Sequence, residues 1–406
     1  MTAYTPYLDE VLEDPYPAYQ RLRDEAPAYF IEEYGCWFVS RFKDIWECEM
    51  DRKSFTVTDG LLPTQLAVPL EQQAEFRALT SEMAFGSSIS TIDPPKHTPL
   101  RSSVSDLFKP GAAAALEDFT RSRVRQFIDA FAERGECDVV GDLAMKTSVR
   151  VACHLIGLPE EDVDFFVSRI NRSFERDRGV PGMPERALAA NLELFGYLED
   201  YIARHATRRI PRDCALNRLY DFQGWDDPIQ QSDIQAMTYL MLVGGTETLP
   251  KALSAAVFRL AQHPDQRAEL TADPSLVPHA FHEALRYDMP TQMLGRRVVR
   301  ERTLHGHTMK PGQGVLFLFA SANRDEREFP DPDRFDIHRR APRILTFGAG
   351  THMCLGAQMA RMEGKVMIEE LLRRIPEYEV DQANAIRLES EMFQGWKKLP
   401  IRFRPC

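Results

Sequence analysis

The stretch FGAGTHMCLGAQMARME, residues 347–363, carries the strongest chemical signal in the chain. Gly348, Gly350 and Gly356 allow the backbone to turn tightly and to approach a flat group closely. We expect a helix to begin at Cys354, where free N–H groups and a positive partial charge favour a thiolate. A thiolate in this position suits an axial iron ligand. The apolar stripe of the expected helix consists of Leu355, Met359, Met362 and Val366.

Other interpretations of Cys354 remain open at this point. A single cysteine beside a glycine turn is most often buried and inert. A Cys–His nucleophile is a second alternative, although His352 is only two residues away and no third, orienting residue is evident. A zinc site is a third alternative, but further ligands are not found nearby in the sequence.

A second informative stretch, LVGGTETLP at residues 242–250, lies in the middle of a long predicted helix. Glycine, threonine and proline are poor choices inside an apolar helix. Pro250 cannot donate to the carbonyl of Thr246 and its ring crowds that carbonyl, so we predict that the helix opens locally. Glu247 and Thr248 could then pass protons to a group in the resulting groove. The alternative is a simple kink with a threonine bonded back to its own backbone.

Length and composition limit the classes of protein to which the chain can belong. Its 406 residues are 44% hydrophobic, which is enough for a substantial buried core. No run approaches the ~18 apolar residues that a membrane helix needs. The N-terminus has acidic residues and prolines where a secretion signal would be apolar. A net charge of -11 argues against a general nucleic-acid binder, so we expect a protein that acts without membrane or nucleic acid.

The cysteines indicate a reducing compartment. There are seven of them, scattered singly and without a CxxC pair. This pattern argues against a disulfide framework and against a cysteine zinc site. We therefore expect a cytoplasmic protein.

Hydrophobic periodicity predicts strands near both ends of the chain and helices between them. Helices are expected after Asp14-Pro15 and over residues 111–134, 138–157, 185–209, 232–262 and 275–288. Strand-like patterns cover a hairpin at 29–39 and the stretch 294–322, in which Val315–Phe319 is predicted to be buried. Segments 56–92 and 171–186 have weak periodicity, which is typical of lids or binding loops.

Taken together, these motifs resemble those of the cytochrome P-450 superfamily. The family's haem-binding signature is matched at Phe347, Gly348, Gly350, His352, Cys354 and Gly356. The resemblance implies a mainly α fold with a smaller β region, a long central helix that crosses the haem, and small sheets near the N- and C-terminal parts. It implies that residues 1–406 form a single domain without a fused reductase. It also implies haem b as cofactor, Cys354 as the iron ligand and O2 as co-substrate.

The resemblance assigns roles to further residues. Gly244-Gly245-x-Glu247-Thr248 is similar to the family's oxygen-activation motif, in which Glu247 would be the acid, Thr248 the alcohol and Gly245 a neighbour of the haem. Phe347 and Gly348 would contact the haem from the cysteine side. The partners implied for the two haem propionates are His97, Arg101, Arg297 and His352. Glu283 and Arg286 match the family's Glu-x-x-Arg pair, whose implied role is structural.

Electron supply is expected to come from a separate protein, because the chain has no GxGxxG dinucleotide fingerprint. The resemblance implies a ferredoxin with its reductase. A basic face around the cysteine loop could receive this partner, although ordinary solvated charge is an equal alternative. Its expected members are His338, Arg339, Arg340, Arg343, Arg361, Lys365, Arg373 and Arg374.

The substrate is expected to be a hydrophobic small molecule, and we favour a terpenoid, steroid-like or aromatic compound over a fatty acid. Largely apolar regions would contact it, with Thr291 or Gln292 orienting one polar group. These regions are Leu61, Leu62, Leu66, Phe85 and Ile89, then Phe174 to Met183, Met289 to Leu294, and Met392-Phe393. Two other functions stay open: a haem sensor or carrier without turnover, and a peroxide-driven peroxygenase on the same fold.

Overall fold

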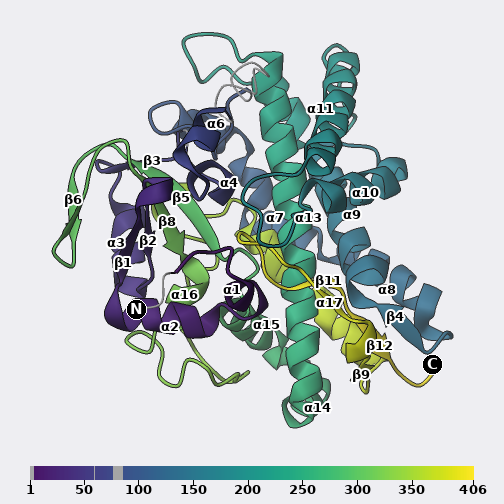
Figure 1. Cartoon of the computed structure of the whole chain (residues 1–406). Helices are drawn as coiled ribbons and strands as arrows, with labels where there is room; N and C mark the ends of the chain where they lie inside the picture. Colours follow the sequence, from purple (N-terminus) through teal and green to yellow (C-terminus); the bar gives the residue numbers. More distant parts are fainter. Residues whose placement is uncertain (1–3, 59, 76–85) are drawn as a thin grey trace.

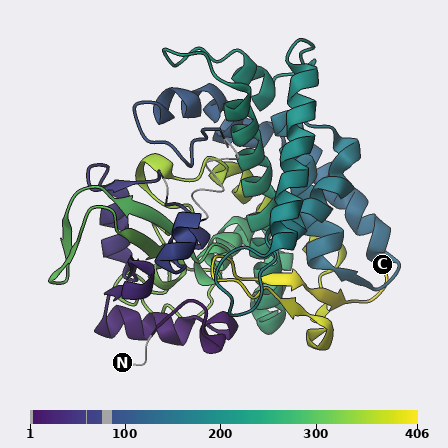
Figure 2. The same cartoon turned by 45° about the horizontal axis from the view of Figure 1, so that its top comes forward.

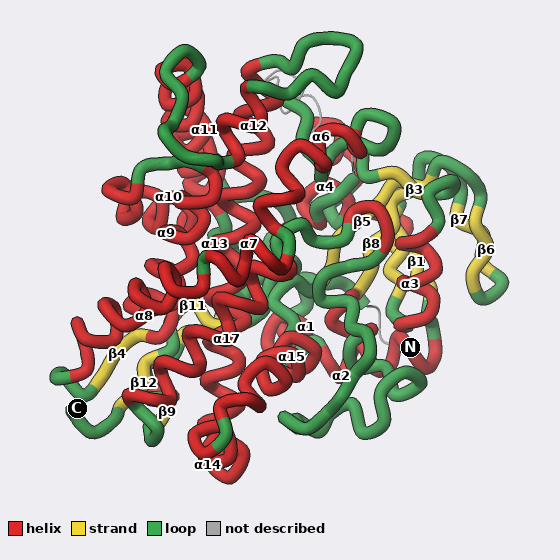
Figure 3. Tube along the Cα trace, turned by 180° about the vertical axis from the view of Figure 1, so that it is seen from behind, coloured by secondary structure: helices red, strands yellow, loops and turns green. Residues whose placement is uncertain are grey.

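The computed structural model describes residues 4–58, 60–75 and 86–406. One long helix, α13 (Gln231–Gln262), crosses the whole molecule, with the larger sheet on one side of it and most of the helices on the other (Figures 1 and 3). The two termini lie on opposite sides, the N-terminus near the larger sheet and the C-terminus near a smaller one (Figure 2). The expected mainly α fold with a long central helix and small sheets is confirmed.

The helices of the described chain follow one another from the N-terminus as α1 (Asp9–Glu13), α2 (Tyr16–Glu25), α3 (Phe42–Met50), α4 (Pro63–Leu66), α6 (His97–Ser105), α7 (Pro110–Ala115), α8 (Glu117–Ala132), α9 (Met145–Ile156), α10 (Val163–Ser173), α11 (Glu185–His205), α12 (Ala215–Tyr220), α13, α14 (Pro264–Ala272), α15 (Val277–Tyr287), α16 (Phe319–Ala322) and α17 (Ala357–Arg374). The strands are β1 (Ala28–Ile31), β2 (Cys36–Val39), β3 (Phe55–Thr56), β4 (Glu136–Asp138), β5 (Met293–Val298), β6 (Arg302–Leu304), β7 (His307–Met309), β8 (Gly314–Leu318), β9 (Glu379–Val380), β10 (Ile386–Arg387), β11 (Trp396–Lys398) and β12 (Pro400–Arg402).

The larger sheet has the strand order β1-β2-β8-β5-β3. The hairpin predicted at 29–39 forms its edge: β1 and β2 pair antiparallel, and Gly35 turns the chain with a φ of 56°. β2 pairs parallel with β8, and β8 pairs antiparallel with β5. The strands near the C-terminus form two small sheets, β4-β12-β9 and β10-β11. The larger sheet therefore joins strands from the first sixty residues to strands at residues 293–318, and the C-terminal strands lie in separate small sheets.

Helix α13 is buried because it is apolar on most of its circumference. It packs against α9, α11, α15 and α17. The predicted opening of this helix is not seen as an interruption, since the helix is continuous through Pro250. Instead, hydroxyl groups bond back to the helix: Thr246 donates to the carbonyl of Leu242 at 2.7 Å, and Thr248 to that of Gly244 at 3.1 Å. A single missing hydrogen bond is tolerated in a helix held by packing on several sides.

The last helix begins later than predicted. Helix α17 starts at Ala357, not at Cys354, because the preceding residues form a tight turn in which the N–H of Cys354 donates to the carbonyl of Phe347 at 2.8 Å. The expected apolar stripe is otherwise present, with Met359, Met362 and Val366 buried. Two further boundaries differ: the predicted helix over 111–134 is divided into α7 and α8, and the buried run that begins at Val315 ends its strand at Leu318, where α16 follows.

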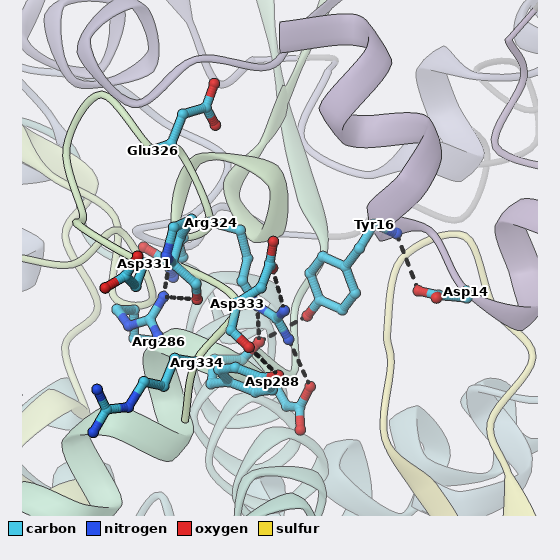
Figure 4. Close-up of polar contacts among 12 residues, drawn as sticks. Asp14, Tyr16, Arg286, Asp288, Arg324, Glu326, Asp331, Asp333 and Arg334 are labelled. Atoms are coloured by element: carbon cyan, nitrogen blue, oxygen red, sulfur yellow. Dashed lines mark hydrogen bonds and ion pairs between the residues drawn. The ribbon is translucent and has the colours of Figure 1, made fainter. Parts of the chain in front are cut away.

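A network of arginines and carboxylates ties α15 to the segment before the cysteine loop. Figure 4 shows the part of it around Arg286 and Arg324, in which Arg324 contacts Asp333 at 2.7 Å and Asp288 at 3.4 Å. The guanidinium of Arg286 makes two 2.8 Å contacts with the carboxylate of Glu283 and donates to the carbonyls of Asn323 at 2.8 Å and Pro332 at 2.9 Å. Arg339 donates to the same carboxylate at 3.1 Å. Buried charges of this kind are stable only when every one is paired. The Glu-x-x-Arg pair therefore has the structural role that was expected.

Candidate active site

Cys354 lies in a turn just before α17, close to positive charge. Its sulfur accepts a hydrogen bond from the N–H of Gly356. Burial raises the pKa of the Cys354 thiol, while this N–H and the guanidinium groups of Arg101 and Arg361 oppose the rise. The side chain of Cys354 is exposed and is therefore accessible to a metal. The N–H and the two guanidinium groups favour the thiolate, although they do not cancel the effect of burial.

The loop before Cys354 has no room for side chains at its glycines. Gly348 has a φ of 65°, and an added Cβ would lie 3.3 Å from a carboxylate oxygen of Glu49. Gly350 has a φ of 67°, and its Cβ would lie 2.5 Å from the carbonyl oxygen of Glu49. Phe347 is partly buried, and the guanidinium of Arg361 lies 4.5 Å from the centre of its ring. The glycines are therefore needed for the close packing of this loop on α3.

The middle of α13 has an uncovered face at its two glycines. Gly244 and Gly245 are exposed, whereas most of the helix is buried. A Cβ added to Gly244 would meet nothing within 4 Å, and one added to Gly245 would meet only the Cβ of Ala152 at 3.9 Å. Thr248, one turn after Gly244, is partly exposed. This face can accept a flat group against the backbone.

His97, at the start of α6, is a buried histidine without a polar partner. Its side chain is 2% exposed, and neither ring nitrogen has a hydrogen-bond partner. Burial lowers the pKa of His97 to about 4, and the positive charges of His352 and Arg101 lower it further. A buried polar group without a hydrogen-bond partner is costly, so an anionic group that accepts a hydrogen bond from this imidazole would stabilise the site.

The other predicted cations differ in how free they are to meet an anion. Arg101, one turn after His97, donates to the carbonyl of Met353 at 2.7 Å. His352 has both ring nitrogens engaged, with Asp93 at 2.8 Å and with the carbonyl of Ile89 at 3.2 Å. The structure thus brings His97, Arg101 and His352 together beside the cysteine loop.

Strand register places Arg297 on the same side as this cluster. Arg297 pairs with Thr56 across β5 and β3, so the two side chains share one face of the sheet. The hydroxyl of Thr56 donates to Asp93, the partner of His352. Arg296 points to the opposite face, where it contacts Glu49 at 2.6 Å. The sequence prediction named Arg297, and the pleat of the strand places Arg297, and not its neighbour Arg296, on the face shared with Thr56.

Glu247 and Thr248 lie next to each other on α13 with different surroundings. Glu247 is 3% exposed, and one of its oxygens, Oε1, is bound by the ammonium group of Lys251. The other oxygen, Oε2, has no hydrogen-bond partner. Burial raises the pKa of Glu247, while the charges of Lys251 and Arg176 oppose this rise. Sequence reasoning missed Lys251, although its spacing of four residues from Glu247 is a recognised signal for an ion pair.

Several residues in the regions expected to contact substrate are packed into the protein, whereas residues 174–183 are partly or fully exposed. Leu66, Met289 and Met293 are each at most 2% exposed. The amide of Gln292 is fully used, since it accepts from the hydroxyl of Tyr19 at 3.0 Å and donates to the carbonyl of Ser390 at 2.9 Å. It is therefore not free to orient a substrate. Phe85 lies outside the described residues.

Many of the cations in the expected basic face have acidic partners. Lys365 contacts Glu117 at 3.1 Å, Arg343 contacts Glu328 at 2.8 Å, and Arg339 contacts Glu283 at 3.1 Å. Arg373 contacts Glu370 at 2.6 Å. These pairs reduce the positive charge of the face only in part, because Glu283 and Glu370 are shared with other arginines. A basic docking face at this place stays a prediction.

The donor set fits a haem held by a thiolate. An uncovered cysteine, an uncovered glycine face on the central helix and an unpaired buried histidine beside an arginine match the iron, the flat ring and the propionates of such a group. No group of three or more His, Cys, Asp or Glu side chains in the described residues is placed to hold a separate metal ion. Fold and site together define a haem-thiolate protein.

Comparison with known proteins gives the family. The family model described as Cytochrome P450 matches residues 193–393. The chain is 37% identical to cytochrome P450 123 of Mycobacterium tuberculosis (strain H37Rv), over 98% of this chain and 96% of that protein. It is 32% identical to vitamin D(3) 25-hydroxylase of Pseudonocardia autotrophica, over 97% of this chain and 94% of that one. The crystal structure of CYP109E1 from Bacillus megaterium in complex with testosterone is similar, with a TM-score of 0.85 and 28% identity over 98% and 100% of the two chains.

The chain therefore belongs to the cytochrome P450 family. It is a monooxygenase whose cofactor is haem and whose co-substrate is O2. No helix in the described part of the chain has both the length and the apolar character needed to cross a membrane.

Proposed function

We propose that this enzyme hydroxylates a hydrophobic small molecule of the steroid or terpenoid type, with Cys354 as the iron ligand. The observation that supports this proposal most strongly is the exposed thiol of Cys354 just before α17. The positive charges of Arg101 and Arg361 lie near this thiol and favour its thiolate form. When bound, the haem supplies activation of O2 by a thiolate-ligated iron. Every other contribution comes from the side chains around it.

Glu247 and Thr248 deliver protons. The free Oε2 of Glu247 takes up a proton from water, and the partly exposed hydroxyl of Thr248 passes one toward the uncovered face of α13. Gly245 leaves the space in which this transfer takes place. Delivery at this face favours oxygen insertion into substrate over the release of peroxide.

His97, Arg101 and Arg297 hold the two propionates, and His352 would join them only by giving up its bond to Asp93 or to Ile89. The support for His97 is its pair of unpartnered ring nitrogens, and the support for Arg297 is the sheet face that it shares with Thr56. Arginine's fork suits a carboxylate, and a buried carboxylate needs a cationic partner. Phe347 and Gly348 pack on the cysteine side of the ring.

The substrate class rests on the apolar surroundings and on two relatives. One relative is named a vitamin D(3) 25-hydroxylase, and one similar structure contains testosterone. Both compounds are largely apolar and have a steroid or steroid-derived carbon skeleton. We therefore expect steroid-like compounds to shift the Soret band of the resting enzyme more strongly than fatty acids do. A stronger response to fatty acids would overturn this substrate class.

Electrons come from a separate ferredoxin, and residues 1–406 act as one cytochrome P450 domain. The docking face centres on Arg340, Arg343, Arg361 and Lys365, of which Arg361 is close enough to Cys354 to affect its pKa. Arg340→Glu should raise the KM for ferredoxin, and the effect should shrink with added salt. Arg208→Glu, at an exposed position in another region, is the matched control. The free cysteines support a cytoplasmic location.

The experiment that tests the proposed function measures the absorption spectrum of the reduced protein under carbon monoxide. We expect the red-shifted Soret band of a thiolate-ligated haem. We then expect hydroxylated product from a steroid with NADH, ferredoxin and reductase, and little product with peroxide alone. Product with peroxide alone at the same rate would favour a peroxygenase, and no product under either condition would favour a haem carrier.

A further inference from the structure

Lys251 is a buried cation in the interior of the central helix. It is 6% exposed and lies one turn after Glu247 on α13. Its ammonium group donates to Oε1 of Glu247 and, at 3.0 Å, to the carbonyl of the same residue. Burying an ammonium group is costly unless it is paired. The pairing is therefore strong enough to decide where the carboxylate of Glu247 points.

The segment near the C-terminus packs over this pair. The ring of Phe393 lies 5.6 Å from the ammonium nitrogen of Lys251, and a Cβ added to Gly395 would lie 2.9 Å from the Cβ of Lys251. The lysine is thus enclosed by apolar and backbone atoms. Its ammonium group has little freedom to leave the carboxylate.

Other titratable groups face Glu247 from neighbouring elements. Arg176, in the segment after α10, acts on Glu247 electrostatically and pairs with Glu391 at 3.6 Å. Tyr239, two turns earlier on α13, is also within electrostatic reach of Glu247. Neither side chain donates a hydrogen bond to Oε2, which has no hydrogen-bond partner among the described residues. One oxygen of the carboxylate is therefore held and the other is free.

We propose that Lys251 is a positioning residue for proton delivery, because it holds Oε1 of Glu247 and leaves Oε2 as the oxygen that takes up and releases the proton. This inference rests on the proposed role of Glu247. In each cycle Oε2 gains one proton from water and loses one to the hydroxyl of Thr248, whose own proton leaves toward the uncovered face. Lys251 keeps its protons throughout. Without the lysine, the buried carboxylate would retain a proton and rotate freely.

The test compares Lys251→Met with Lys251→Arg in the haem-loaded enzyme. The first readout is infrared and does not depend on turnover: Lys251→Met should show an additional carbonyl band of a protonated carboxyl at neutral pH, seen in the difference spectrum against the parent. The second readout is the ratio of product to NADH consumed, which should fall about tenfold in Lys251→Met. The solvent deuterium isotope effect on product formation should be larger in Lys251→Met than in the parent. Lys251→Arg, which keeps the charge, should restore most of the coupling.

Glu247→Gln separates this inference from the function on which it rests. The new infrared band must be absent in Glu247→Gln/Lys251→Met, and the two substitutions together should be no worse than Glu247→Gln alone. If Lys251→Met retains the parent's coupling and infrared spectrum, the inference is wrong. If its defect persists unchanged in the Glu247→Gln background, Lys251 is only structural. If Glu247→Gln itself leaves coupling unchanged, the proposed role of Glu247 fails first.

A control is needed because Lys251→Met could disturb the helix. The band under carbon monoxide and the unfolding temperature report whether the haem site is intact. If Lys251→Met does not load haem, Lys251→Gln is measured in its place, since it keeps a polar group of similar length without the charge. The same infrared band is expected there, and its absence would contradict the inference.

Discussion

The imidazole rings of His97 and His352 meet edge to face, with their centres 4.7 Å apart. Both nitrogens of His352 are engaged by Asp93 and Ile89, whereas both nitrogens of His97 lack a partner. The two histidines therefore have different roles. His352 anchors the cysteine loop to the segment before α6, and His97 is free to bind an anion. This division leads to the first prediction.

His97→Phe should release haem faster than the parent protein does. The substitution removes the hydrogen-bonding group that is free to meet a propionate, and a hydrogen bond to a charged group contributes roughly 1.5–3 kcal/mol, so we expect an increase of about tenfold or more. Transfer of haem to apomyoglobin measures the rate. His279→Phe, at an exposed position on α15, is the control and should not change it. Equal rates in His97→Phe and the parent would contradict the assignment.

The haem-free protein should lose stability as the pH falls. The pKa of His97 is lowered from 6.5 to about 4 in the folded chain, so the unfolded chain binds more protons between these values. The free energy of unfolding contributed by His97 is therefore fully present above pH 6.5 and decreases as the pH falls toward about 4. Urea unfolding at several pH values measures the slope. A slope that is the same in His97→Phe would show that other groups cause it.

Thr248→Ala should uncouple electron use from product formation. The hydroxyl of Thr248 lies on the uncovered face of α13, and its loss removes the group that passes the proton. We expect the yield of product per NADH to fall about tenfold, with peroxide in its place. Thr246→Ala is a matched control, because this hydroxyl is buried and bonds only back to Leu242 at 2.7 Å. Unchanged coupling in Thr248→Ala would remove the proposed role.

Cys354→His should keep haem but lose oxygenation. A neutral imidazole can bind iron, yet it does not donate charge as a thiolate does. The reduced variant under carbon monoxide should lack the red-shifted Soret band. Cys406→Ser, which changes the other exposed cysteine, should retain that band and full activity. Oxygenation by Cys354→His at the parent's rate would exclude a thiolate ligand at this position.

Glu283→Gln should lower the free energy of unfolding without changing the ratio of product to NADH consumed. The carboxylate is 1% exposed and pairs with both Arg286 and Arg339, so its neutralisation leaves two guanidinium groups underpaired. Breaking a buried ion pair costs about 3–5 kcal/mol. Chemical unfolding measures the loss, and any haem-loaded fraction should have the parent's coupling ratio. A stable variant with poor coupling would place Glu283 in the chemistry after all.

The fold was predictable in outline because its signals are local. Apolar periodicity located the hairpin at 29–39 and the helices, and the glycines at 348 and 350 marked the cysteine loop. Boundaries were less predictable, since they depend on hydrogen bonds made outside the element. The start of α17 moved from Cys354 to Ala357 because a backbone bond to Phe347 closes the turn first. Helix α13 stayed continuous at Pro250 because packing on several sides outweighs one lost hydrogen bond.

The sequence by itself determined the chemistry-bearing motifs of this protein: the glycine-bounded Cys354, the Glu247-Thr248 pair and the Glu283–Arg286 spacing. Each lies within a few residues of chain, where backbone geometry fixes which groups are neighbours. Only the tertiary structure decided that His97 is free while His352 is engaged, that Arg297 and not Arg296 shares a face with Thr56, and that Gln292 is fully used. Those outcomes depend on strand register and on contacts between distant segments, which no local pattern encodes.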